Sequence, residues 1–287
     1  MNAPTLVFAA VGHEFQNPDR GRLYISTLDT TTGTWLGPQP CGYGAGEPVF
    51  LPGAPVAMAK QSESVTTLMV VSSDGRLNVM WHDESVPESG WHGPGLISNP
   101  LFPPFCELTL SRQSSSIFSA VAVDLDVGAT VAWLADGGSG WAAPVPFGEA
   151  RFAPGAPVAM TMQNDHQLTL LAGDVGQPGS NVPRLNVAYV QAGGDWQGPY
   201  PFGPALGVYA FDAPNGRSVA VARQSDRTLT AVTVNADGQM CVAWESDGGD
   251  WNGPVPFGAQ DFLRGTRVSM CQWQGDVLAA VAVDRYG

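Results

Sequence analysis

The chain has 287 residues and a formal net charge of −13, with 13 lysines and arginines against 26 acidic residues. Nucleic acids and anionic membranes are bound through clustered basic side chains, so an acidic chain whose one lysine is Lys60 argues against both partners. No apolar run approaches the roughly 18 residues of a membrane-spanning helix, and the opening Met-Asn-Ala-Pro-Thr has no secretory signal pattern. We therefore expect a soluble, cytoplasmic protein, with export by a signal-free route left open.

The chain repeats itself with a period of about 55 residues. Tryptophans that open W-x-x-P or W-x-G-P segments recur at spacings of 56, 50, 55 and 55, namely Trp35, Trp91, Trp141, Trp196 and Trp251. In three copies the continuation is nearly identical: PVPFG at 144–148, PYPFG at 199–203 and PVPFG at 254–258. A fixed period of this kind is the sequence signature of a repeat architecture.

Each copy predicts four short β-strands. The first complete copy shows the pattern, with apolar runs at 56–61, 67–71 and 77–81 before the Trp91 segment. Turn signals such as Asp74-Gly75 and Asp237-Gly238 separate the second and third runs. No stretch has a sustained 3.6-residue period, so the class is all-β.

Four antiparallel strands that recur five times predict a five-bladed β-propeller, in which radial closure protects most strand edges. The blades are assigned to residues 36–91, 92–141, 142–196, 197–251, and 252–287 joined with 1–35, within a single domain of residues 1–287. The last blade is then closed by strands from both termini. The strand count is twenty-one, one more than five such blades need, because 5–12 and 277–284 both resemble the second strand.

The fifth position of the first strand differs among the copies. It holds Lys60, Arg112, Met162, Arg223 and Gln272. In a propeller these positions form a ring, and an acidic chain that gathers cations there indicates an anionic or strongly polar ligand. The alternative is that each cation pairs with a neighbouring carboxylate such as Glu107.

Two further sets of residues are candidates for ligand binding. A glutamine follows the varied position in four copies and could bond a ligand hydroxyl or the adjacent blade: Gln61, Gln113, Gln163 and Gln224. An aromatic residue ends the third strand in four copies, and could stack on a sugar or pack between blades: Trp81, Trp133, Tyr189 and Trp244.

The sequence shows no catalytic motif. The histidines, His13, His82, His92 and His166, form no metal-spaced pair, and there is no nucleophile elbow, P-loop or dinucleotide fingerprint. We therefore expect no metal and no cofactor. The cysteines, Cys41, Cys106, Cys241 and Cys271, show no C-x-x-C spacing, which favours buried thiols over disulfides or a metal site.

The repeat unit W-x-G-P … F-x-P-G-x-P-V-A-M … Q … D-G-x-L-x-V-x-W resembles the tryptophan-containing repeats of propeller lectins. The similarity is to bacterial fucose-binding lectins, and more loosely to fungal fucose-specific lectins and tachylectin-type five-bladed propellers. The resemblance implies sugar sites between blades, with an aromatic ring stacked on the sugar and Arg, Gln or Glu bonded to its hydroxyls. Residues that match those roles are the four aromatic residues and four glutamines above, with Arg112 and Arg223.

The leading hypothesis is a lectin-like protein that binds a small glycan or another polar small molecule. One alternative is a cofactor-independent enzyme, such as a cyclase or dehydratase, that acts on a natural-product-type molecule in one asymmetric pocket. Its candidate catalytic residues are Lys60, Arg112, Arg223 and His166, because cations stabilise developing negative charge and Lys or His can transfer a proton. The third option is a protein-interaction scaffold. The oligomeric state is left open, with a homodimer as one option.

Overall fold

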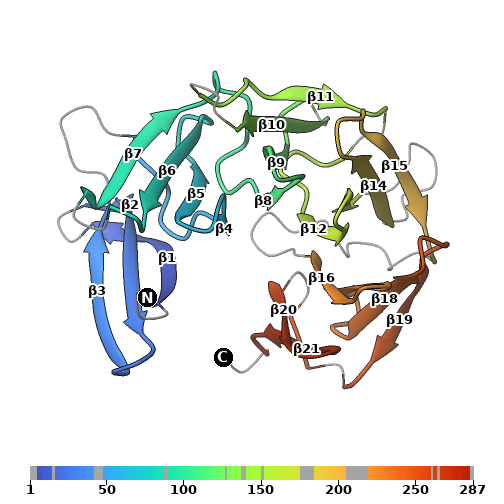
Figure 1. Cartoon of the computed structure of the whole chain (residues 1–287). Helices are drawn as coiled ribbons and strands as arrows, with labels where there is room; N and C mark the ends of the chain where they lie inside the picture. Colours follow the sequence, from blue (N-terminus) through green and yellow to red (C-terminus); the bar gives the residue numbers. More distant parts are fainter. Residues whose placement is uncertain are drawn as a thin grey trace. The chain divides into compact units, whose positions relative to one another are not determined.

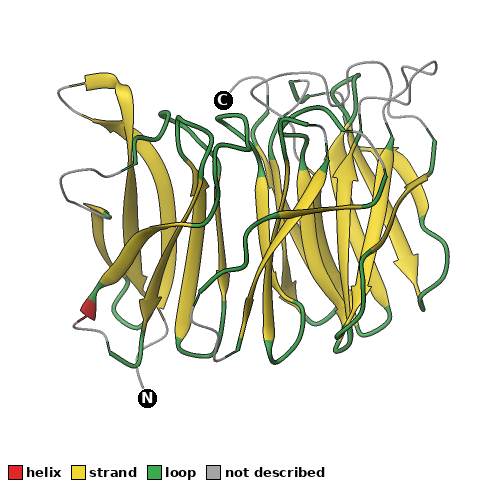
Figure 2. Ribbon diagram, turned by 90° about the horizontal axis from the view of Figure 1, so that it is seen from above, coloured by secondary structure: helices red, strands yellow, loops and turns green. Residues whose placement is uncertain are grey.

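The computed structural model describes residues 5–14, 17–41, 48–86, 89–126, 128–136, 140–149, 152–174, 184–204, 219–259, 261–263 and 266–284. Strands dominate the described chain (Figure 2). The chain divides into two compact units, Met1–Cys106 and Glu107–Gly287. Each unit is a series of antiparallel sheets whose strands follow one another in sequence order. In the part of the chain that is described, no helix is long and apolar enough to cross a membrane.

The first unit contains two sheets. The three-stranded sheet consists of β1 (Thr5–Glu14), β2 (Asn17–Asp29) and β3 (Thr34–Pro40). The four-stranded sheet consists of β4 (Val56–Lys60), β5 (Val65–Val71), β6 (Leu77–Asp83) and β7 (Trp91–Leu96). Their facing side chains form one core, in which Leu23 and Ile25 pack with Leu68 and Met80.

The second unit contains three four-stranded sheets and one two-stranded sheet (Figure 1). The first comprises β8 (Leu108–Arg112), β9 (Ile117–Val123), β10 (Ala129–Ala135) and β11 (Val145–Phe147). The second comprises β12 (Val158–Asn164), β13 (Gln167–Gly173), β14 (Leu185–Gln191) and β15 (Gln197–Phe202). The third comprises β16 (Val219–Ser225), β17 (Thr228–Val234), β18 (Met240–Ser246) and β19 (Asn252–Phe257), and the last β20 (Val268–Gln274) and β21 (Val277–Ala282).

The second strand of each four-stranded sheet is almost completely buried, and β13 shows why. Alternate side chains of a strand point to opposite faces of its sheet. Leu168 and Leu170 pack toward the β8–β11 sheet, whereas Leu171 packs with residues of the β16–β19 sheet. Because both faces are covered, the sequence of β13 is a nearly continuous apolar run rather than an alternating one.

The repeated PxPFG and W-x-G-P segments contact each other across neighbouring sheets. Gly203 has a φ of 69°, and a Cβ atom there would lie 2.1 Å from the carbonyl oxygen of Gly253. Gly148 makes the same approach to Gly198 in the preceding pair of sheets. The tryptophans of these segments also pack between sheets, since the rings of Phe202 and Trp251 lie 5.0 Å apart. The repeated PxPFG and W-x-G-P segments are therefore explained by close backbone contacts between adjacent sheets.

The structure corrects the number of blades. The described residues form six sheets, so the prediction of five blades, with one last blade built from both termini, is wrong. The physical reason lies in the surplus strand. β1 and β21 both occupy the second-strand position of the repeat, so the β1–β3 and β20–β21 sheets belong to two different copies. That the whole chain is a single domain stays a prediction.

The cysteines fit the expected burial in part. Cys106 and Cys241 are buried, and burial raises the pKa of the Cys241 thiol to about 11. Cys271 is exposed, contrary to the prediction. Cys271 lies in β20, a strand in which most side chains are exposed.

Candidate functional site

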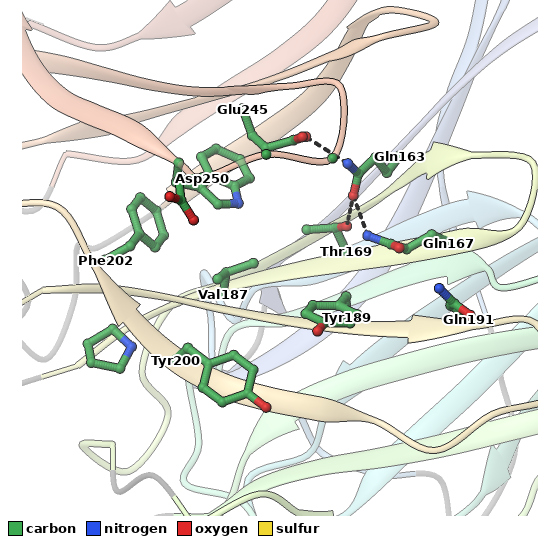
Figure 3. A pocket seen from close by; sticks show the side chains of 14 residues that line it. Gln163, Gln167, Thr169, Val187, Tyr189, Gln191, Tyr200, Phe202, Glu245 and Asp250 are labelled. Atoms are coloured by element: carbon green, nitrogen blue, oxygen red, sulfur yellow. Dashed lines mark hydrogen bonds between the residues drawn. The ribbon is translucent and has the colours of Figure 1, made fainter.

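A cavity of about 830 Å³ lies where the β12–β15 sheet meets the β16–β19 sheet, within the second unit (Figure 3). Its walls combine amide and hydroxyl side chains, aromatic rings and two carboxylates. The polar side chains belong mainly to β12, β13 and β14, and the carboxylates belong to the end of β18 and the turn that follows it. The cavity thus arises between two consecutive repeats.

Gln163 is the centre of the polar network in this cavity. Its Oε1 atom accepts a hydrogen bond from Thr169 Oγ1 at 3.0 Å and another from Gln167 Nε2. Its Nε2 atom donates to Glu245 Oε2 at 2.7 Å, from one sheet to the next. Because the Gln163 carbonyl is held by two donors of β13, its amide nitrogen is oriented toward the neighbouring sheet.

Glu245 is a buried carboxylate with an unsatisfied oxygen. The residue is 2% exposed, and its Oε1 atom has no hydrogen-bond partner. Burial raises the pKa of Glu245, and the nearby Asp247 charge raises it further, while the backbone amides of Gly248 and Gly249 act in the opposite direction. A buried polar atom without a partner is unusual in a folded protein, so this carboxylate marks the cavity as a candidate ligand site.

Aromatic side chains form the apolar part of the cavity wall. The rings of Tyr189 and Tyr200 lie 6.5 Å apart and are tilted by 44°. Phe202 and Trp251 form the second pair, with their rings inclined at 30°. Tyr200 is 50% exposed, which leaves a large part of its surface accessible. Aromatic surface with a few fixed polar groups is the usual composition of a small-molecule site.

The turn after β18 shapes the remaining wall. Asp247 and Gly248 adopt positive φ values of 61° and 73°, so the chain turns sharply behind Glu245. Gly248, Gly249 and Asp250 then line the cavity. The Asp247 carboxylate is bound by the Arg227 side chain, which neutralises its charge locally.

The four predicted glutamines make one contact in common. Each carbonyl oxygen accepts a hydrogen bond from a hydroxyl six residues later, at distances of 2.7 to 3.1 Å: Gln61 with Thr67, Gln113 with Ser119, Gln163 with Thr169, and Gln224 with Thr230. This bond fixes the first strand to the second strand within each blade. Of the four, Gln163 lines the cavity.

The varied position of the first strand has a different local partner in each copy. Lys60 pairs with Glu84, and Arg223 pairs with Asp226 at 2.8 Å and with Asp165 at 3.7 Å. Arg112 Nη2 donates to the carbonyl oxygen of Ser115 at 3.1 Å.

The structure also gives the surroundings of the other two varied residues, Met162 and Gln272, and of Glu107. Met162 packs against a hydrophobic core, and Gln272 donates to the backbone carbonyl of Gly275. Glu107, proposed as a neighbour for these cations, pairs with Arg267 instead. Neither the five varied residues nor His166 is among the cavity-lining side chains, so their binding or catalytic roles stay predictions.

The predicted aromatic set is divided between the cavity and the surface. Tyr189 lines the cavity. Trp81, Trp133 and Trp244 are each between 36% and 39% exposed, and Trp81 stacks on His92 with ring centroids 5.3 Å apart. Their exposure leaves them accessible to a ligand, and their role in binding stays a prediction.

Sequence reasoning missed Gln167, Gln191, Tyr200, Glu245 and Asp250, which all line the cavity. A signal for Glu245 was present. The position after the third-strand aromatic residue holds His82, Leu134 and Val190 in the neighbouring copies, and a carboxylate there is a departure from the repeat. The contact between Glu245 and Gln163, which lies 82 residues earlier, could not be predicted from the repeat pattern.

Comparison with solved structures finds propeller lectins. The BP39L lectin from Burkholderia pseudomallei is 27% identical to this chain, with a TM-score of 0.75, over 97% of this chain and 81% of that one. A variant of the Aleuria aurantia lectin in complex with α-methyl-L-fucoside has a TM-score of 0.57 at 13% identity, over 98% of this chain and 88% of that one. No protein-family model and no curated protein matches the chain.

A further structure of the Aleuria aurantia lectin is described as a six-bladed β-propeller with a novel fucose recognition mode. It has a TM-score of 0.51 at 14% identity, over 93% of this chain and 84% of that one. The six sheets of the described chain agree with six blades. The predicted resemblance to propeller lectins is confirmed, and the fold is of the lectin-like propeller type.

Proposed function

We propose that this protein is a lectin-like carbohydrate-binding protein, and that a saccharide occupies the cavity between the β12–β15 and β16–β19 sheets. The observation that carries the proposal is the joint presence of aromatic surface and oriented amide and hydroxyl groups in one inter-sheet cavity. A saccharide has apolar C–H faces that pack on aromatic rings and hydroxyls that both donate and accept hydrogen bonds. Lectins of similar fold that are solved in complex with α-methyl fucoside support the carbohydrate-binding part of the proposal.

A glycan array followed by calorimetric titration of the best ligand tests the proposal. The variant Tyr200→Ala removes an exposed ring from the cavity wall, and we expect it to weaken binding about tenfold, which corresponds to about 1.4 kcal/mol. Val145→Ala is the matched control, because Val145 holds the equivalent position in β11 and lies outside the cavity. Absence of binding to every glycan, or equal loss in both variants, would contradict the proposal.

A further inference from the structure

The charges in the cavity have one sign. Among its lining side chains the ionisable groups with a formal charge are Glu245 and Asp250, and no lysine, arginine or histidine is present. The whole chain is acidic, with a net charge of −13, so its long-range field also attracts cations. A cavity with this charge distribution favours a positively charged group and disfavours an anion.

Of the two carboxylates, Glu245 is the one that a bound cation would stabilise more. The residue is 2% exposed, its Oε2 atom accepts a hydrogen bond from the neutral amide of Gln163, and its Oε1 atom is buried without a hydrogen-bond partner. A buried charge costs free energy unless an opposite charge or sufficient hydrogen bonds compensate it. A cation bound in the cavity would offset that cost through its attraction to the carboxylate, which is strong where water is excluded.

The other walls suit a cation that also carries hydroxyl groups. The rings of Tyr189, Tyr200 and Trp251 line the cavity. The face of an aromatic ring carries negative electrostatic potential and attracts an ammonium group within about 6 Å. The amide groups of Gln167 and Gln191 offer donors and acceptors for hydroxyls. A saccharide with a free amino group combines the two requirements.

We propose that this cavity selects saccharides that carry a protonated amino group over their neutral counterparts. The inference rests on the proposed carbohydrate-binding function and names the ligand class of that same site. The equivalent positions in the described neighbouring copies hold His82, Leu134 and Val190 instead of Glu245. This selectivity therefore belongs to one inter-sheet cavity and is not a property of the repeat.

Calorimetric titration of the full chain with three methyl glycosides tests the inference. They are methyl glucosaminide, its N-acetylated counterpart and α-methyl fucoside, each at low salt and at about pH 6, where the free amine is protonated. We expect the amino compound to bind about tenfold tighter or more than either neutral glycoside. The N-acetyl compound is the closest control, because it keeps the sugar ring and loses the charge.

Two variants assign the preference to Glu245. Glu245→Gln keeps an acceptor for the Gln163 amide and removes the charge, and we expect it to abolish the preference. Asp237→Asn removes one negative charge from an exposed turn beside the same sheet, and it should leave the preference intact. If Glu245→Gln fails to fold, the wild-type protein still tests the inference. Raising the pH until the amine of the glycoside is neutral should remove the tighter binding of the amino compound.

The outcomes separate the inference from the proposed function. Equal or tighter binding of a neutral glycoside overturns the amino-sugar preference and leaves the carbohydrate-binding function standing. Absence of binding to all three glycosides and to a glycan array overturns both. A preference that survives in Glu245→Gln overturns the role of this carboxylate.

Discussion

Replacing Gln163 by leucine tests the polar network of the cavity most directly. The variant removes the donor to Glu245 Oε2 and leaves both carboxylate oxygens without a side-chain hydrogen bond. A hydrogen bond to a charged group contributes about 1.5–3 kcal/mol, and a buried acceptor left unsatisfied costs about 1–3 kcal/mol. We therefore expect Gln163→Leu to lower the free energy of unfolding by about 2–4 kcal/mol at neutral pH.

Gln113→Leu is the matched control for this variant. Gln113 accepts the corresponding hydrogen bond from Ser119 and is 6% exposed, but among the described residues it makes no hydrogen bond to a carboxylate. A neutral hydrogen bond contributes about 0.5–1.5 kcal/mol, so the control should lose less stability. Chemical denaturation followed by tryptophan fluorescence measures both free energies of unfolding.

The pH dependence gives the Gln163→Leu experiment a second readout. Because the pKa of Glu245 is raised in the folded state, the folded protein binds this proton more tightly than the unfolded chain does. The cost of the ionised carboxylate is absent below its ordinary pKa and develops as the pH rises through the folded-state pKa. The loss in Gln163→Leu should therefore shrink in acid. A loss equal to that of Gln113→Leu, or one that does not change with pH, would show that the Gln163–Glu245 hydrogen bond does not stabilise the ionised carboxylate.

Three further predictions follow from the same structure. Glu245→Gln should keep or raise the free energy of unfolding at neutral pH. In denaturation series at several pH values, the decline of this free energy above the ordinary glutamate pKa should be smaller in the variant than in the wild type. A large loss of stability at neutral pH would contradict this prediction. Gly203→Ala should lower the free energy of unfolding by about 2 kcal/mol or more, because its Cβ would lie 2.1 Å from a carbonyl oxygen of β19. Gly258→Ala is the control, since a Cβ there meets nothing within 4 Å, and it should lower the stability less in the same assay. Combined Trp81→Ala and Trp244→Ala should reduce glycan-array binding if these exposed rings add sites, and an unchanged array would restrict binding to the cavity.

The strands could be predicted from the sequence because the repeat aligns residues with the same packing role. The apolar runs at 67–71 and 77–81 lie within β5 and β6, where both faces of the strand are covered. The number of blades could not be predicted in this way, because the copies at the two ends are incomplete. Residues 5–12 and 277–284 resemble one strand type, and sequence alone does not show whether such strands share a sheet.

The candidate site was predictable only in part, for a related reason. Gln163 and Tyr189 belong to positions that recur in every complete copy, so comparison among the copies identified them. Glu245 and Asp250 complete the cavity from the next repeat, and their effect depends on distances across two sheets. The attention that the sequence drew to Lys60 and Arg223 came from their charge, which in the structure is paired with nearby carboxylates.

A crystal structure of the protein soaked with its best array ligand would locate the bound saccharide. We predict a sugar ring in the cavity between the β12–β15 and β16–β19 sheets, in contact with Tyr189 or Tyr200 and with a polar group within hydrogen-bonding distance of the Gln163–Glu245 pair. A saccharide bound elsewhere, with this cavity filled by water alone, would show that the cavity is not the carbohydrate site.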